Sequence, residues 1–127
     1  MAQTTQDLVA RAREQITEVD QADARRRMEH GAVVLDVRDD HEYDAGHVPD
    51  AVHITRGCLE FKIGDNPATK DPDTEIVVYC KGGGRAAMAA QRLQEMGYTN
   101  VVSMKGGYDG WVAAGEDVAT EGQDEEE

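Results

Sequence analysis

The sequence lacks the residues and patterns that mark several large classes of protein. Only two of its 127 residues are cysteine, which excludes a framework of several disulfides. No run approaches 18 consecutive apolar residues, so we expect no membrane-spanning helix and no membrane partner. The N-terminal stretch lacks the basic start and apolar core of a signal peptide. We therefore expect a cytoplasmic protein with reduced thiols.

Positive charge is also scarce. Lysine and arginine together number 13, against 26 acidic residues, and the formal net charge is −13. Such a charge opposes the phosphate backbone of nucleic acids, so we expect no nucleic-acid partner. The histidines at 41, 47 and 53 form no familiar zinc-ligand spacing with either cysteine, and we predict no metal and no other cofactor.

The sequence does contain apolar runs of strand length that alternate with helical patterns. Continuous apolar runs predict buried strands at 32–37, 75–80 and 100–104, with shorter strands near 16–19 and 51–53. Helical patterns follow or precede each run, at 5–16, 21–29, 39–46, 56–64, 85–96 and 106–115. This alternation predicts an α/β fold with a mostly parallel sheet, in which ligands bind beyond the carboxyl ends of the strands.

The densest cluster of reactive groups is the segment CKGGGR. Cys80 closes a predicted buried strand and is followed by Lys81, by Gly82, Gly83 and Gly84, and by Arg85. Glycines allow a backbone whose N–H groups converge on an anion, and the next helix adds the positive end of its dipole. We interpret Cys80 as a nucleophilic thiolate with an anionic substrate. The alternative is a buried cysteine before an ordinary glycine-rich turn.

Three motifs, in order, resemble the signature of the rhodanese family. They are LDVRDDHEYDAGHVPDAVHI, CKGGGRA and GGYDGW. The resemblance implies a three-layer α/β/α fold around a five-stranded, mostly parallel sheet, spanning residues 16–115. An amphipathic helix at 1–15 would precede this domain, and an acidic, disordered tail would follow at 116–127.

The resemblance also implies an activity. A sulfurtransferase of this family moves a sulfane sulfur from a thiosulfate-like donor to cyanide or a thiol through a cysteine persulfide. Cys80 resembles the persulfide-forming nucleophile, and Lys81 to Arg85 resemble the loop that binds the substrate. In this loop Arg85 either braces the backbone or meets the anion. A protein partner in a sulfur relay is a further expectation.

The motif around Asp36 suggests support rather than chemistry. Asp36 and Arg38 match the family's Asp-x-Arg, and Glu42 and His47 match positions that hold the same segment together. We interpret all four as structural, since buried charges persist when they are paired. Asp50 stands where the family commonly has glycine or asparagine, which is a tolerable change in a turn.

Four further residues allow two interpretations each. Cys58 is either a packing cysteine or a resolving thiol for Cys80. Lys105 either lies in solvent or adds positive potential at the site. Tyr108 and Trp111 are interpreted as core or rim packing rather than substrate contacts.

Two other functions compete with sulfur transfer. One is a persulfide carrier or docking module that serves a partner protein without turnover. The other is a phosphatase or arsenate reductase, whose loop resembles this one but has five residues between cysteine and arginine. Here there are four, from Lys81 to Gly84, which favours a single sulfur atom over a tetrahedral oxyanion.

Overall fold

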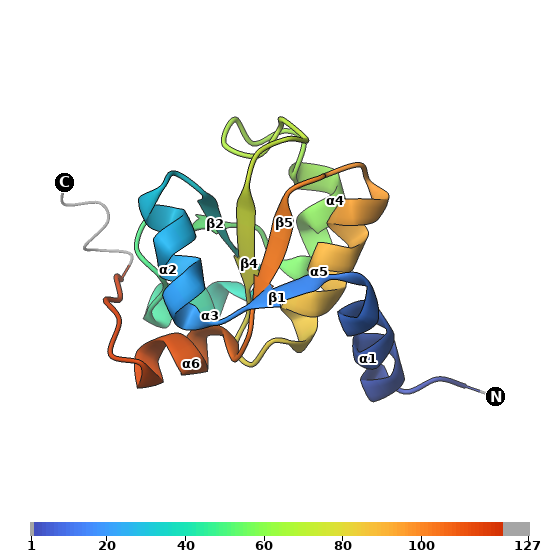
Figure 1. Cartoon of the computed structure of the whole chain (residues 1–127), viewed down its shortest axis with the longest axis horizontal. Helices are drawn as coiled ribbons and strands as arrows, with labels where there is room; N and C mark the ends of the chain where they lie inside the picture. Colours follow the sequence, from blue (N-terminus) through green and yellow to red (C-terminus); the bar gives the residue numbers. More distant parts are fainter. Residues whose placement is uncertain (1, 121–127) are drawn as a thin grey trace.

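A five-stranded parallel sheet forms the middle layer of the computed structural model, which describes residues 2–120 (Figure 1). The strand order is β1-β5-β4-β2-β3, and all four pairings are parallel. The strands are β1 Thr17–Val19, β2 Val33–Asp36, β3 Val52–His53, β4 Ile76–Tyr79 and β5 Val101–Met104. The predicted α/β fold with a five-stranded parallel sheet is confirmed.

Helices cover both faces of this sheet. Helices α2 and α6 lie on one face, and α1, α4 and α5 lie on the other, while α3 lies near the end at which the strands point (Figure 1). Their bounds are α1 Thr5–Gln15, α2 Gln21–Glu29, α3 Asp40–Ala45, α4 Leu59–Lys62, α5 Gly84–Glu95 and α6 Gly107–Ala113, and a 3-10 turn at Arg56–Cys58 precedes α4. Among residues 2–120, no helix is long and apolar enough to cross a membrane.

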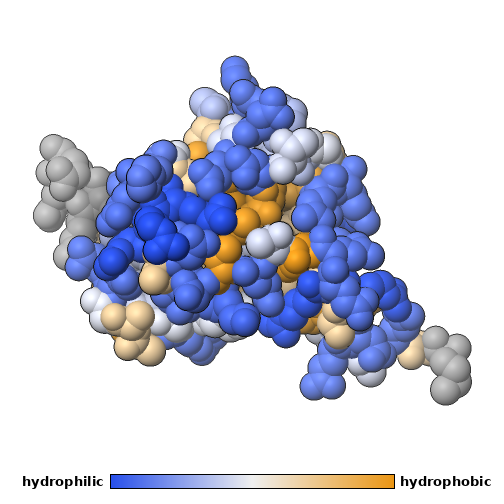
Figure 2. Space-filling view, in the orientation of Figure 1, coloured by the Kyte–Doolittle hydropathy of each residue, from blue (hydrophilic) through white to orange (hydrophobic). Residues whose placement is uncertain are grey.

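The two faces of the sheet explain the continuous apolar runs. Val78 packs into a core with Leu93 of α5, whereas its neighbour Val77 packs into a second core with Trp111 of α6. Because successive strand residues point to opposite faces and both faces are covered, every residue of β4 is buried. The outer surface of the helices is largely hydrophilic, and apolar groups show in a strip between the two helical layers (Figure 2).

The segment after α6 continues along the body of the protein. We expected disorder from residue 116, but the backbone N–H of Ala119 donates to the His47 carbonyl oxygen at 2.8 Å, and the reverse bond is 2.9 Å. The Trp111 Nε1–H donates to the Asp117 carbonyl oxygen at 2.7 Å. Residues 116–120 are therefore hydrogen-bonded to the domain. The rest of the expected tail, 121–127, lies outside the described residues.

Helix α1 packs against its own domain. A capping box at Thr4 begins the helix, and Ala12 on its inner face is fully buried. The Gln91 side chain of α5 donates to Gln15 at 3.0 Å. This packing brings α1 to the edge of the sheet at which the strands end (Figure 1).

Candidate active site

The carboxyl ends of three neighbouring strands bring the predicted site residues together. β4 lies between β2 and β5, so the loop that follows Tyr79 is flanked by the segments after Asp36 and after Met104. This is the edge at which parallel sheets bind ligands. Asp36 lies opposite Tyr79 in this order, so Asp36 and Cys80 lie at the same edge of the sheet.

The sulfur of Cys80 is held by backbone N–H groups. Gly83 N–H donates to Cys80 Sγ at 3.0 Å, and Ala86 N–H donates at 3.3 Å. Ala86 lies in the first turn of α5, so the positive end of that helix dipole faces the sulfur. Cys80 is only 1% exposed. The arrangement stabilises negative charge on sulfur and limits access to it.

Only one of the three loop glycines is demanded by the backbone. Gly83 has φ +122°, a conformation that residues with a side chain rarely adopt. A Cβ added to Gly82 would meet nothing within 4 Å, and one added to Gly84 would lie in ordinary contact, 3.5 Å from Val9. The glycine that bends the loop is therefore also the one whose N–H reaches the sulfur.

Backbone N–H groups of helix α6 support the first two residues of the Cys80 loop. The Tyr108 N–H donates to the Cys80 carbonyl oxygen at 2.7 Å, and the Asp109 N–H donates to that of Lys81 at 3.1 Å. A Cβ added to Gly107 would collide with the Cys80 carbonyl oxygen and lie 2.6 Å from that of Lys81. From the sequence we assigned Gly107 no role. The glycine pair 106–107 was the signal that could have indicated this close approach of two backbone segments.

The two loop cations are engaged with carboxylates. Arg85 donates to Glu42 through both Nη atoms, at 2.8 and 3.1 Å. These hydrogen bonds lower the pKa of Glu42 from 4.5 to about 2 and raise that of Arg85. Lys81 Nζ lies 2.8 Å from a carboxylate oxygen of Asp109. Of the two roles expected for Arg85, its geometry fits bracing the loop against α3.

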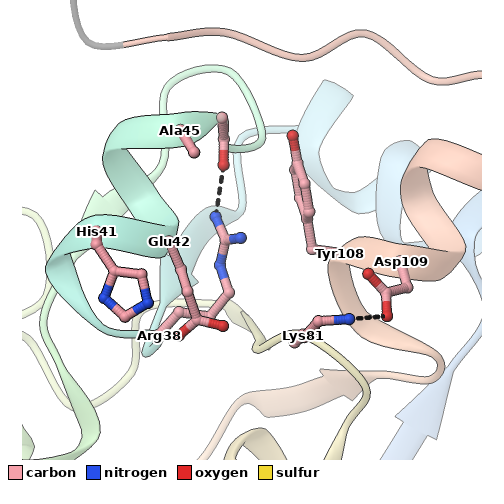
Figure 3. A pocket seen from close by; sticks show the side chains of 8 residues that line it. Arg38, His41, Glu42, Ala45, Lys81, Tyr108 and Asp109 are labelled. Carbon is pink, nitrogen blue, oxygen red and sulfur yellow. Dashed lines mark hydrogen bonds and ion pairs between the residues drawn. The ribbon is translucent and has the colours of Figure 1, made fainter.

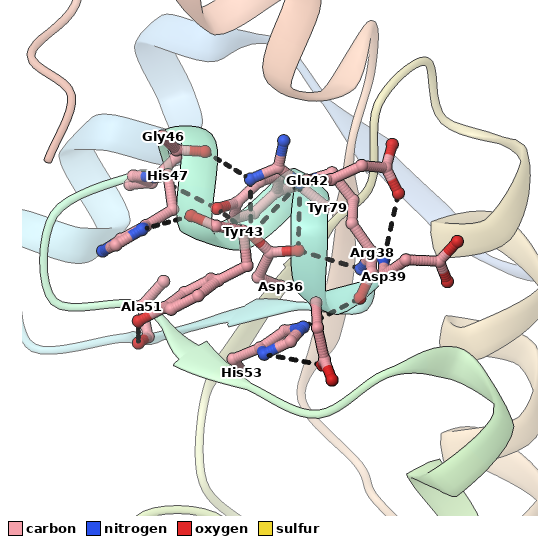
Figure 4. Close-up of polar contacts among 12 residues, drawn as sticks. Asp36, Arg38, Asp39, Glu42, Tyr43, Gly46, His47, Ala51, His53 and Tyr79 are labelled. Carbon is pink, nitrogen blue, oxygen red and sulfur yellow. Dashed lines mark hydrogen bonds and ion pairs between the residues drawn. The ribbon is translucent and has the colours of Figure 1, made fainter. Parts of the chain in front are cut away.

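Asp36 is the centre of a buried polar network (Figure 4). It is 0% exposed, pairs with Arg38 at 2.8 Å and accepts from the Tyr79 hydroxyl at 2.5 Å. The Arg38 guanidinium also donates to the Gly46 carbonyl oxygen at 2.7 Å, and Val48 N–H donates to the Tyr79 hydroxyl at 3.1 Å. Burial raises the pKa of Tyr79, and the neighbouring Asp36 carboxylate raises it further. The network ties β2, β4 and the end of α3 together.

His47 holds the far end of α3. Its side chain is fully buried, and its Nδ1 lies 2.9 Å from the Tyr43 carbonyl oxygen. The ring stacks on Tyr43 at 3.8 Å between centroids, and His53 stacks against Tyr43 at 4.4 Å. These contacts place His47 in the support of the segment and not at the sulfur.

A cleft of about 320 Å³ opens between α3 and α6, beside the first residue after the cysteine (Figure 3). The Tyr108 ring forms one wall and lies over the Arg38 guanidinium at 4.3 Å. The lining is Arg38, His41, Glu42, Ala45, Gly46, Lys81, Tyr108 and Asp109. Cations and carboxylates are mixed in this cleft, so it carries no strong excess of either charge.

The remaining sequence candidates lie around the site. Cys58 is half-buried and packs against the core that also contains Cys80, and both thiols are free. Lys105 is exposed, and its N–H donates to the carbonyl oxygen of Val19. Asp50 has φ +67°, the left-handed conformation for which glycine and asparagine are favoured. Among residues 2–120, no group of three or more metal-ligating side chains occurs.

Comparison with known proteins agrees with this geometry. The model of the rhodanese-like domain matches residues 20–114. The chain belongs to the rhodanese family. A thiosulfate sulfurtransferase GlpE from Pseudomonas savastanoi pv. phaseolicola is 37% identical over 94 residues, which cover 74% of this chain and 85% of that protein.

Two solved structures extend the rhodanese likeness. A Rhodopseudomonas palustris protein, described as of unknown function and a "Possible Tyrosine Phosphatase", superposes with a TM-score of 0.82 at 32% identity, covering 94% of this chain and 96% of that one. The polysulfide-sulfur transferase homodimer of Wolinella succinogenes superposes with a TM-score of 0.77 at 28% identity, covering 89% and 85%. Membership in the rhodanese family, with the likeness to GlpE, supports the expected sulfurtransferase activity.

Proposed function

We propose that this rhodanese transfers a sulfane sulfur from a thiosulfate-like donor to cyanide or a thiol through a persulfide on Cys80. The observation that carries the proposal is the pair of N–H groups on Cys80 Sγ, from Gly83 and Ala86, at the start of α5. These donors suit a thiolate before transfer and a persulfide after it. The name of the GlpE relative supports thiosulfate as the donor.

In the first half-reaction the Cys80 thiolate attacks the outer sulfur of thiosulfate. A bond forms between Sγ and that sulfur, the donor's own S–S bond breaks, and its electron pair leaves with sulfite. The outer sulfur remains on Cys80 as a persulfide anion. No external oxidant or reductant takes part, because the donor already carries sulfur at the required oxidation level.

In the second half-reaction the acceptor removes this sulfur. Cyanide attacks the outer sulfur of the persulfide, the S–S bond on Cys80 breaks, and thiocyanate leaves while the thiolate is restored. A thiol acceptor takes the sulfur in the same way and becomes a persulfide. Two separate half-reactions predict ping-pong kinetics. A partner protein in a sulfur relay would use its own thiol in this step.

The competing functions make different use of the same loop. A carrier would form the persulfide but release it only to a partner protein. A phosphatase has some support from the description of the Rhodopseudomonas palustris protein. The four residues between Cys80 and Arg85 favour a single sulfur over phosphate, because a shorter loop leaves less room for a tetrahedral oxyanion.

One experiment separates these functions. The protein is mixed with thiosulfate and its intact mass is recorded before and after cyanide is added, with Cys80→Ser as the matched control. We expect a gain of one sulfur that disappears with cyanide and is absent in Cys80→Ser. An adduct that survives cyanide and small thiols would favour the carrier. No adduct, together with hydrolysis of an aryl phosphate, would overturn the proposal.

A further inference from the structure

The sequence suggests that Lys81 and Arg85 bind an anionic substrate, but the fold pairs both side chains with carboxylates. Lys81 is paired with Asp109, and both Nη atoms of Arg85 are taken by Glu42. The positive charge of each of these cations is largely offset by the neighbouring carboxylate. The cleft side of the Cys80 loop is therefore close to neutral, although the expected donor is an anion.

A third cation approaches the loop from the opposite side. Arg13 of α1 points toward Gly83, and a Cβ added to Gly83 would lie 3.2 Å from Arg13 Nη2. The neighbouring turn of α1 also contacts the loop, since Val9 lies 3.5 Å from the position of a Cβ on Gly84. The absence of a side chain at Gly83 thus lets a guanidinium approach the backbone that holds the sulfur.

The distance from this guanidinium to the sulfur is bounded by the contacts already described. Gly83 N lies 3.0 Å from Cys80 Sγ, and Arg13 Nη2 lies 3.2 Å from the Cβ position of the same glycine. With standard bond lengths between these points, Nη2 lies at most about 9 Å from Sγ. At this separation the guanidinium attracts an oxyanion group carried by a sulfur donor at Cys80.

Arg13 is held in a way that leaves its outer nitrogens available. Its Nε donates to Glu18 of β1 at 3.2 Å, and this is its one ion pair within residues 2–120. The Arg13 side chain is 45% exposed, so a small anion can reach it from solvent. Lys105, also exposed, follows the neighbouring strand β5.

We propose that Arg13 is a donor-binding residue that contacts the oxyanion group of the sulfur donor. The inference rests on the proposed function and deepens it, because it names the charge of the donor and the side from which the donor is recognised. It also gives a role to α1, which lies outside the segment matched by the family model. Arg13 takes no part in bond making, so its loss weakens capture of the donor without changing acceptor chemistry.

The test compares kinetic constants among four proteins: the native chain, Arg13→Gln, Arg13→Lys and the matched control Arg11→Gln. Arg11 is an exposed arginine of the same helix with no ion pair among the described residues. For thiosulfate we expect kcat/KM to fall about tenfold in Arg13→Gln and about threefold in Arg13→Lys, and to stay within about twofold in Arg11→Gln. The kcat/KM for cyanide, which carries one negative charge, should fall by no more than about threefold in Arg13→Gln.

A donor of lower charge sharpens the test. An alkyl thiosulfonate carries one negative charge where thiosulfate carries two, so Arg13→Gln should lower its kcat/KM less, by about threefold. Equal values for Arg13→Gln and Arg11→Gln would overturn the inference. A loss that appears equally in the acceptor step would also overturn it, because that result indicates a general disturbance of the loop.

A binding measurement separates this inference from the proposed function. Thiosulfate is titrated by calorimetry into Cys80→Ser and into Cys80→Ser with Arg13→Gln, where no transfer can occur. We expect the second protein to bind about fivefold more weakly. If the native chain forms no persulfide, the proposed function fails while this titration still judges Arg13. Equal binding, or no binding by either protein, would overturn the role of Arg13.

Discussion

Two regions at the same edge of the sheet hold their charges by different means. The support network of Asp36, Arg38 and Tyr79 is buried and joined through side chains. The loop from Cys80 to Arg85 instead holds the Cys80 sulfur through backbone N–H groups. Side-chain charge therefore fixes the position of the segment, while the backbone makes the environment of the sulfur. Motif residues that carry charge need not be the residues that meet the substrate.

The two regions are joined by one ion pair. Glu42 belongs to α3, beside the support network, and its carboxylate holds Arg85 at the end of the loop. The Asp39 N–H also donates to Glu42, at 3.0 Å, which orients the carboxylate within the first turn of α3. Variants in the network, in the loop and in this connection should therefore give three distinguishable results.

The largest effect on stability is expected in the support network. Asp36→Asn removes the charge that faces Arg38 and leaves that guanidinium buried without a counter-ion. We expect the free energy of unfolding to fall by about 3–5 kcal/mol. Denaturant unfolding followed by circular dichroism measures this loss. Asp44→Asn, at an exposed position of α3, is the control and should change stability by less than about 0.5 kcal/mol. Similar unfolding of the two variants would contradict the role of Asp36.

The next effect is expected in the loop and should appear mainly in activity. Gly83→Ala places a side chain on a residue with φ +122°, which costs about 1–3 kcal/mol and moves the N–H away from the sulfur. We expect at least about a tenfold loss of kcat/KM in a thiosulfate–cyanide assay.

Gly82→Ala provides the comparison within the same loop. An added Cβ at Gly82 meets nothing within 4 Å, so kcat/KM should stay within about twofold of the native value. Equal losses in the two variants would indicate that the loop needs flexibility at every glycine, and not one bent residue whose N–H reaches the sulfur.

The smallest effect concerns the connection between the two regions and depends on pH. The pKa of Glu42 is lowered to about 2 in the folded protein from 4.5. Its stabilising effect is therefore complete above about pH 4.5 and is lost as the pH falls toward about 2. We expect Glu42→Gln to lower the free energy of unfolding by about 1–2 kcal/mol at neutral pH, and by less at about pH 3.

Denaturant unfolding of the native chain and Glu42→Gln at the two pH values measures this difference. If the difference in unfolding free energy between the two proteins stays constant or widens toward acid, the carboxylate of Glu42 does not stabilise the fold through Arg85. A constant difference would further indicate that the substitution disturbs the packing of α3.

The elements of the fold were predictable because local signals agreed with the tertiary arrangement. The helical pattern at 21–29 predicted α2, and the Asp20 side chain that begins this helix accepts from the Asp23 N–H at 2.8 Å. The continuous apolar run that contains Val77 and Val78 predicted a strand covered on both faces. The motif around Cys80 predicted the loop and the following helix. Each signal lies within a few residues of the structure it predicts.

The contacts that were missed join segments far apart in the chain. Lys81 pairs with Asp109, Gly107 leaves room for the Cys80 carbonyl oxygen, and Arg13 approaches Gly83. No local pattern around Arg13 distinguishes it from Arg11. The expectation of disorder from residue 116 missed a long-range contact for the same reason. The local composition indicates solvation, while the pairing of Ala119 depends on the distant His47.

The sequence by itself determined the alternation of strands and helices, the family and the choice of Cys80 as the candidate nucleophile. It could do so because periodicity, capping and the motif around Cys80 are local properties of the chain. Only the tertiary structure decided which carboxylates pair with the cations of the loop. Ion pairs form between groups that the strand order brings together, and these partners are as far apart in the sequence as Glu42 and Arg85 or Lys81 and Asp109. The two cations next to the cysteine in sequence are therefore paired with carboxylates in the fold.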